Sequence, residues 1–269
     1  MMKLIKNIFA ISVAFYGIHG QAQVINPLPL VNDQWRFSGT IAGWAPASWT
    51  TTTVRNRSVT TDATINQNVT SAGGLAMFSL EGHKGRFGLM GDLVYWQLKG
   101  SNSLTRYTPG DNASIYGGYN GQVSQTMLTM AGTYTAYQSP SVYLDGLLGA
   151  RYITSTTTIA ANFRLDAAGR STSLSGYPSV RNQTTDPVIG FKGRARIMDS
   201  SWFIPFYADA GKGSGSNNGT WQTMVGVGNA YSWGDVALTY RAMGFHLKGT
   251  DVNNNFTNAG PQLSATINF

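Results

Sequence analysis

The sequence contains no cysteine and very little charge. Because Cys is absent from all 269 residues, no disulfide stabilises the fold. Charged residues make up 12% of the chain, whereas soluble globular domains carry roughly 25%. These two absences disfavour an ordinary cytosolic enzyme. Because no disulfide is available, we expect an extensive hydrogen-bonded sheet to hold the fold together.

Long apolar runs are also missing. A transmembrane helix needs roughly 18 or more consecutive apolar residues, and no stretch of this sequence has them. A helical membrane bundle is therefore excluded. Disorder is disfavoured too, because aromatic residues reach 12% of the chain.

One compact apolar segment, residues 8–18, lies at the extreme N-terminus behind Lys3 and Lys6. The small residues Gly20 and Ala22 follow it. This order is typical of a secretory signal peptide. We predict a signal peptide over residues 1–22. The alternative is a short N-terminal helix packed on a soluble domain.

The chain is basic, with a net charge of +7. It has no long Lys/Arg cluster that would follow a phosphate backbone, so we expect no nucleic-acid partner. A phosphorylated lipid or an envelope polymer is the expected anionic neighbour.

The last nine residues alternate strictly between apolar and polar side chains. Leu263, Ala265, Ile267 and Phe269 share one face, and the other face is polar but uncharged. This period of two predicts a β-strand that is apolar on one side.

The same alternation recurs upstream, with charged residues on one face of each run. It predicts an all-β fold, a transmembrane antiparallel up-and-down β-barrel of ten strands, with eight or twelve as alternatives. The expected strands are residues 34–45, 75–82, 85–99, 122–137, 141–156, 186–198, 202–214, 219–231, 235–248 and 259–269.

The connections between these strands alternate between short and long. Short turns are predicted near residues 82–85, 138–141, 198–201 and 232–235, and most of the others are long. Outer-membrane barrels have short periplasmic turns and longer extracellular loops. The pattern therefore predicts the outer membrane of a Gram-negative bacterium as the location, with both termini in the periplasm. We accordingly expect an N-terminal periplasmic segment over residues 23–33 and one barrel domain over residues 34–269. The expected partners are outer-membrane lipid and lipopolysaccharide, whose phosphates are anionic.

Several segments resemble a family of largely uncharacterised, porin-like Gram-negative outer-membrane β-barrel proteins. They are GRFGLMGDLVYWQL, LDGLLGARY, DPVIGFKGRARIMDSSWF, GTWQTMVGVG, ALTYRAMGF and GPQLSATINF. The resemblance implies fold and location rather than an activity. It also implies that Phe269, Ile267 and Ala265 form the signal that the outer-membrane assembly machinery recognises.

The charged faces should point into the barrel lumen, because lipid disfavours charge. The expected lumen charges are Arg36, Glu81, Arg86, Asp92, Asp145, Arg151, Lys192, Arg194, Arg196, Asp209 and Arg241, seven positive and four negative. They predict either a salt-bridged interior that fills the lumen or an anion-preferring pore. Filling is favoured, because Trp44, Trp96 and Tyr207 also point inward. We further expect Glu81 to pair with Arg86 across a tight turn.

No residues are arranged for catalysis or metal binding. The three histidines are His19, His83 and His246, and none has the Ser or Asp arrangement of a triad. Outer-membrane proteases called omptins use acidic residues and a His at strand tops, and no matching cluster is found. We therefore expect no catalytic site, no cofactor and no metal.

The predicted function is non-enzymatic: a structural barrel, or one that binds a ligand through its extracellular loops. The alternatives are a small-solute or anion channel and, third, a loop-borne enzyme. The segment over residues 46–74 is long for a hairpin connection, and we expect part of it to fold over or into the barrel mouth.

Overall fold

The computed structural model describes residues 25–54, 57–108, 113–167, 170–176, 179–213, 219–248 and 252–269. The predicted signal peptide lies outside these ranges. The strands are β1 (Trp35–Trp44), β2 (Ala47–Val54), β3 (Arg57–Ala63), β4 (Ala72–Lys84), β5 (Phe87–Thr108), β6 (Ala113–Gln138), β7 (Val142–Ala167), β8 (Arg170–Gly176), β9 (Ser179–Arg196), β10 (Trp202–Gly211), β11 (Gly219–Tyr231), β12 (Gly234–Lys248) and β13 (Val252–Asn268). One short helix, α1 (Ile65–Thr70), precedes β4.

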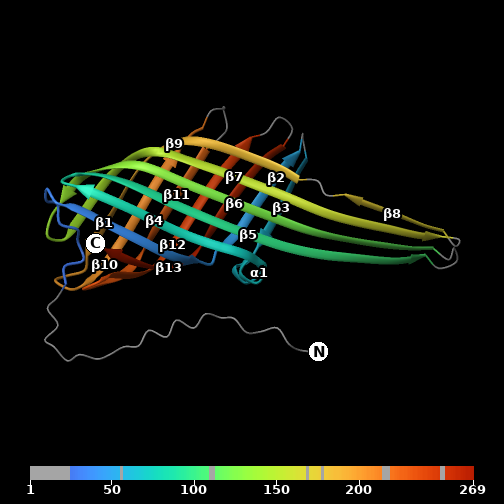
Figure 1. Ribbon diagram of the computed structural model, residues 1–269, viewed down its shortest axis with the longest axis horizontal. Coiled ribbons are helices and arrows are strands. Elements are labelled where there is room, and N and C mark those ends of the chain that lie inside the picture. The colour runs from blue at the N-terminus through green and yellow to red at the C-terminus, as the bar shows by residue number, and fades with distance from the viewer. Residues whose placement is uncertain are drawn as a thin grey trace, which may run out of the picture.

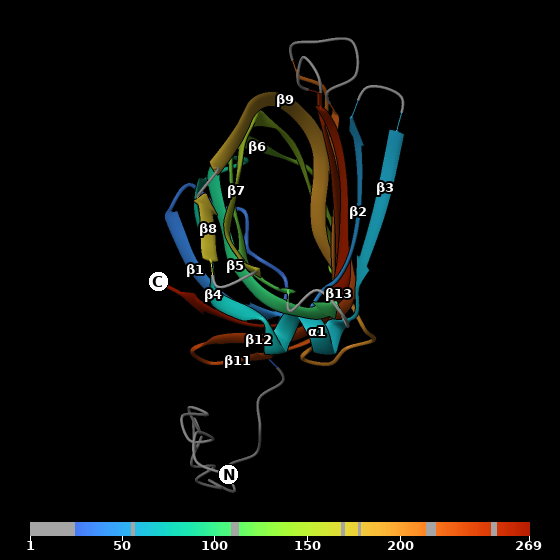
Figure 2. The same ribbon diagram turned by 90° about the vertical axis from the view of Figure 1, so that its right-hand side faces the viewer.

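Ten of these strands form a closed antiparallel barrel (Figures 1 and 2). The order around the wall is β1, β4, β5, β6, β7, β9, β10, β11, β12 and β13. The last strand returns to the first, since Ser38 pairs with Asn268 and Trp44 with Gln262. The predicted up-and-down barrel of ten strands is confirmed. Within the described ranges, no helix has the length and hydrophobicity that a membrane crossing requires.

Alternation of side chains gives the barrel its two surfaces. In β10, Trp202 and Ile204 are exposed on the outside, whereas Phe203, Tyr207 and Asp209 are buried inside. The same period of two holds around the wall, so a continuous apolar surface faces outward. This is the surface that lipid requires.

Aromatic rings gather at the end of the barrel where the short turns lie, which we call the turn end. Outside it, Trp35 stacks on Phe37 with ring centroids 5.5 Å apart, and Phe37 lies 6.1 Å from Phe269. Tyr231 and Trp233 stack at 5.7 Å at the turn between β11 and β12. Aromatic rings at this level are typical of the interface between membrane and water.

At the opposite end, the loop end, several strands continue far beyond the barrel (Figure 1). β6 and β7 have 26 residues each and stay paired from Ser114–Asp166 to Gln138–Tyr143. A transmembrane strand needs only about 9 to 11 residues. The projecting parts of β5, β6, β7, β8 and β9 therefore form a sheet outside the membrane-spanning wall, which we call the projecting sheet.

The segment over residues 46–74 forms β2, β3 and α1. β2 pairs with the loop-end half of β13, from Ala47–Ala259 to Val54–Val252, and β3 pairs with β2. The prediction that part of this segment folds over or into the mouth is wrong for β2 and β3, because they extend the wall. α1 leads back to β4, and its Asn68 donates to the Pro46 carbonyl and to the Ser48 hydroxyl.

Candidate functional site

The predicted lumen charges lie on the inner face of the wall, with one exception. They project from β1, β4, β5, β7, β9, β10 and β12. Arg86 is the exception, because it lies in the turn between β4 and β5 and is exposed. The predicted pair between Glu81 and Arg86 is therefore wrong. Glu81 faces Met90 across the hairpin and makes its ion pair with Lys192 of β9.

An ion pair joins Arg151 of β7 to Asp209 of β10 inside the lumen, and both side chains are fully buried. Arg151 also donates from Nε to the Thr129 hydroxyl at 2.9 Å and from Nη1 to the Thr220 hydroxyl at 3.0 Å. The Tyr207 hydroxyl donates to the same Asp209 carboxylate. The charge of Arg151 is thus fully enclosed by protein groups.

A second ion pair joins Arg241 of β12 to Asp92 of β5. Nη2 of Arg241 lies 2.6 Å from Asp92 Oδ2 and 3.0 Å from Gln222 Oε1, and Nη1 donates to Gln262 at 3.3 Å. Asp92 accepts a further hydrogen bond from Ser79 at 2.6 Å. This network spans the barrel, because β5 and β12 are not neighbours in the wall.

A third group of charges lies nearer the turn end. Glu81 pairs with Lys192, and His83 Nε2 is 3.6 Å from Glu81 and 3.9 Å from Asp145. Asp145 also accepts from the Tyr143 hydroxyl at 3.0 Å. His83, predicted to lie in a tight turn, is instead part of β4 and buried in the lumen.

The alternation argument missed two further lumen carboxylates, Asp186 and Asp235. Asp235 pairs with Arg194 at 2.7 Å, and Asp186 accepts from Thr184 at 2.7 Å. Both lie at the ends of expected strands. Asp186 has the same parity as Lys192, and Asp235 has the same parity as Arg241, so the alternation would have placed both side chains inside. The described lumen cations are Arg36, Arg151, Lys192, Arg194, Arg196 and Arg241. The described lumen carboxylates are Glu81, Asp92, Asp145, Asp186, Asp209 and Asp235. The expected positive excess is therefore wrong, because the two sets balance.

An apolar layer lies in the lumen on the loop-end side of these ion pairs. It consists of Trp44, Met77, Val94, Met127, Ile153, Met243 and Phe245, all buried and in one cluster. Val94 follows Asp92 by two residues, and Met243 follows Arg241 by two, so each lies one step farther toward the loop end on the same inner face. Ions crossing the lumen would have to pass both layers.

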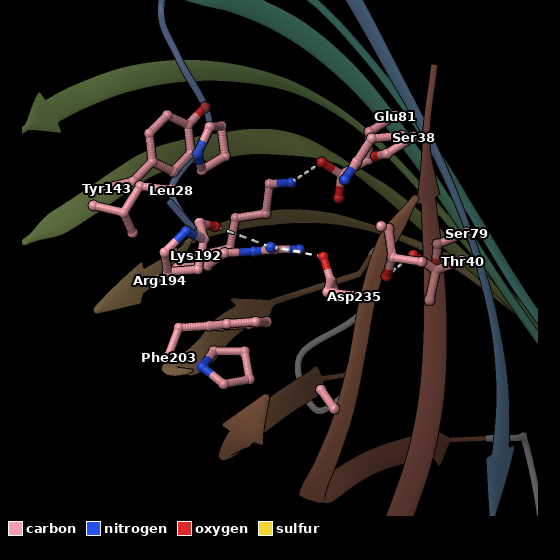
Figure 3. Close-up of a pocket in the computed structure, with 18 of the residues that line it drawn as sticks. Leu28, Ser38, Thr40, Ser79, Glu81, Tyr143, Lys192, Arg194, Phe203 and Asp235 are labelled. Carbon is pink, nitrogen blue, oxygen red and sulfur yellow. Dashed lines mark hydrogen bonds and ion pairs between the residues drawn. The ribbon is translucent and has the colours of Figure 1, made fainter. Parts of the chain in front are cut away.

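On the turn-end side of the ion pairs lies a cavity of about 750 Å³, which we call the chamber (Figure 3). One wall carries small hydroxyl side chains, among them Ser38, Thr40 and Ser79, and the opposite wall carries Lys192 and Arg194. The chamber exists because Ser38, Thr40 and Ser79 are small and leave part of the lumen unfilled.

The N-terminal segment, residues 25–33, covers the chamber at the turn end. Pro27 and Leu28 are buried, and the Pro27 carbonyl accepts from Arg194 at 3.3 Å. The backbone N–H of Gly85 donates to the Asn32 carbonyl at 2.9 Å. Gly85 has a φ of 59°, a left-handed conformation that glycine adopts without strain.

Metal binding finds no support in this site. Among the residues that the structure describes, no group of three or more His, Asp and Glu side chains is arranged to hold a metal ion. His246 is exposed near the loop end of β12, away from the lumen network.

No protein-family model matches this chain, and no curated protein matches it. Several solved structures match this chain. The outer-membrane protease OmpT from Escherichia coli matches with a TM-score of 0.55 and 9% identity, over 88% of this chain and 97% of OmpT. The chain is a transmembrane β-barrel of the Gram-negative outer-membrane type. The likeness to OmpT shows this fold alone.

Two further outer-membrane proteins match with lower TM-scores. Ail of Yersinia pestis, in complex with the heparin analogue sucrose octasulfate, has a TM-score of 0.35 and 10% identity, over 86% of this chain and 99% of Ail. A Pseudomonas aeruginosa FadL homologue has a TM-score of 0.32 and 8% identity, over 87% of this chain and 90% of that chain.

Proposed function

We propose that this protein is a closed, non-enzymatic outer-membrane barrel that binds an anionic envelope or extracellular ligand through its projecting sheet and loops. The observation that supports the proposal is the filling of the lumen at two successive levels. Arg151–Asp209 and Arg241–Asp92 fill one level, and the apolar layer around Trp44 fills the next. A barrel closed in this way offers its loop end, rather than its lumen, as the functional surface.

The orientation follows from the connections. Outer-membrane barrels place short turns in the periplasm and long loops outside the cell. The turn end is accordingly periplasmic, and it holds the N-terminal segment and Phe269. The projecting sheet then faces the extracellular medium, among the phosphorylated lipopolysaccharide molecules.

The charges of the projecting sheet favour an anionic ligand. Lys99, Arg170 and Arg181 are exposed, and within the described residues Arg181 donates only to neutral groups, the Thr154 and Tyr152 hydroxyls. Arg164 differs, because its Nε donates to both carboxylate oxygens of Asp166, at 3.0 and 3.1 Å. Hydrogen bonds from Ser171 and Arg164 lower the pKa of the Asp166 carboxyl, so this pair stays ionised in mildly acidic medium.

A second candidate function is a small-solute or anion channel. The chamber favours it, because about 750 Å³ of space already lies within the turn-end half of the lumen. Conduction would require the apolar layer and the Arg241–Asp92 pair to move apart. We rank this function second for that reason.

The test uses deacylated, phosphorylated lipopolysaccharide core oligosaccharide, which lacks the acyl chains that any barrel surface attracts. Protein refolded in an uncharged detergent is titrated with it by calorimetry, beside the dephosphorylated oligosaccharide. The double variant R170Q/R181Q should bind at least tenfold more weakly than wild type. R86Q, which removes a charge at the turn end, should bind as wild type does. Equal affinity for the phosphorylated and dephosphorylated forms, or no binding by wild type, would refute the proposal.

A further inference from the structure

Arg36 differs from the other cations of the lumen. Arg151, Lys192, Arg194, Arg196 and Arg241 each form an ion pair with a carboxylate. In the part of the chain that the structure describes, Arg36 has no such pair. It projects from β1 into the chamber, whose lining includes it.

The guanidinium of Arg36 has one unoccupied edge. Its Nε and Nη2 atoms are both buried, and neither has a hydrogen-bond partner among the described residues. These two N–H groups lie side by side on the same edge of the planar group. That edge is the one that binds both oxygens of a carboxylate or a phosphate at once.

Nearby protein carboxylates are already engaged. Asp145 accepts hydrogen bonds from Thr135 and Tyr143, and Glu81 pairs with Lys192. Asp235 pairs with Arg194. A buried charged donor without a partner costs free energy, so an occupant that supplies two acceptor oxygens would be stabilised at this edge.

We propose that the chamber binds a small anion bearing a carboxylate or phosphate group, held by the Nε and Nη2 atoms of Arg36. A cavity of about 750 Å³ has room for a small organic acid. The Ser38 hydroxyl lines the same chamber and supplies a further donor for such a molecule, whereas the Thr40 and Ser79 hydroxyls are already bonded to Thr266 and Asp92. This inference concerns the turn end and does not depend on ligand binding at the projecting sheet.

Access to the chamber runs past the N-terminal segment. Leu28 lies near Tyr143 and Arg194 in the lining of the chamber (Figure 3), and the carbonyl of the neighbouring Pro27 accepts a hydrogen bond from Arg194. The anion therefore enters when residues 25–30 move away from the mouth. Among the described residues, this part of the segment is held to the barrel by one hydrogen bond, from Arg194 to Pro27, and by the burial of Leu28.

The test is calorimetric titration of refolded barrel with two probes, succinate and inorganic phosphate, at constant ionic strength. Wild type should bind one or both saturably with one site per chain. R36Q should lose at least tenfold in affinity, and R36K should recover part of it, because Lys keeps the charge but not the planar edge. R86Q and R170Q/R181Q are the controls and should bind the probe as wild type does. The relative affinity for the two probes distinguishes a carboxylate ligand from a phosphate ligand.

Two results would overturn the inference. One is equal binding of the probe by R36Q and wild type, with both barrels folded as judged by the heat-dependent gel shift. The other is the absence of binding in both the wild type and L28A, in which the N-terminal segment is held less tightly. Loss of oligosaccharide binding with retained probe binding would contradict the proposed function and leave this inference intact.

Discussion

Arg151 of β7 and Asp209 of β10 form a fully buried ion pair across the intervening strand β9. The pair joins strands that share no ladder, so it holds the barrel cross-section as well as filling it. Removing one partner would leave the other charge buried among Thr129, Thr220 and Tyr207. This relationship makes the lumen a structural element of the barrel.

D209N should therefore be strongly destabilised. An unpaired buried charge costs about 3–5 kcal/mol, and this variant leaves Arg151 in that state. The measurement is the urea concentration at which the refolded barrel loses its heat-dependent gel shift. R151M/D209L removes both charges and should lose less stability than D209N. A double variant as unstable as D209N would show that the hydrogen bonds around the pair matter more than its charge balance.

The N-terminal segment should protect Leu28 but not Leu30. Leu28 has 6% of its surface exposed and Leu30 has 64%, although they are two residues apart. Because the chain has no cysteine, L28C and L30C each carry a single thiol. A soluble thiol reagent should modify L30C at least tenfold faster in the folded barrel, and equally fast in urea. Equal rates in the folded state would mean that the segment does not occupy the mouth.

The projecting sheet should be dispensable for folding. Gly100 faces Gly121 and Thr158 faces Ser179, so residues 101–120 and 159–178 are each replaced by Asn-Gly. The shortened hairpins keep the membrane-spanning register, and the tight turn suits two antiparallel strands. The variant should retain strand content and the heat-dependent gel shift, and should lose oligosaccharide binding. A variant that cannot refold would show that the projecting sheet stabilises the wall.

Phe269 should matter more for assembly than for stability. Its ring is 72% exposed on the outside of the turn end, and its backbone pairs with Phe37. F269S removes apolar surface worth roughly 1.5 to 3 kcal/mol at most, which is small for a whole barrel. We expect lower outer-membrane levels in cells but normal refolding in detergent. F37S, on the adjacent strand, is the matched control and should reach the membrane more efficiently than F269S.

The membrane-spanning wall was predictable because lipid and lumen impose opposite requirements on alternate residues. In β9, Ile189 and Phe191 are exposed outside while Lys192 and Arg194 point inward, as the alternation requires. At strand ends this constraint weakens. Arg86 was placed inside although it lies in a turn, and Asp235 was missed although it pairs with Arg194.

Beyond the membrane the constraint disappears, and the sequence predicted less. β2 and β3 continue the wall through a Thr-rich segment whose two faces are not distinguished by lipid. The chamber was equally hidden, because its volume depends on how the small side chains of β1 and β4 face Lys192 and Arg194 of β9 across the lumen. No single strand carries that information.

Planar-bilayer conductance tests the closed lumen most directly. Wild-type barrel inserted from detergent should show no unitary current steps, because the ion pairs and the apolar layer block the lumen in series. W44A removes a side chain from the apolar layer, and R241A removes one from the ion-pair layer. A change of current in either variant would assign the current to this lumen. Stable wild-type steps whose size changes in W44A or R241A would contradict the account, since they would show that ions pass through the barrel. A silent wild type, with its folded state verified by the gel shift, is the result that the account predicts.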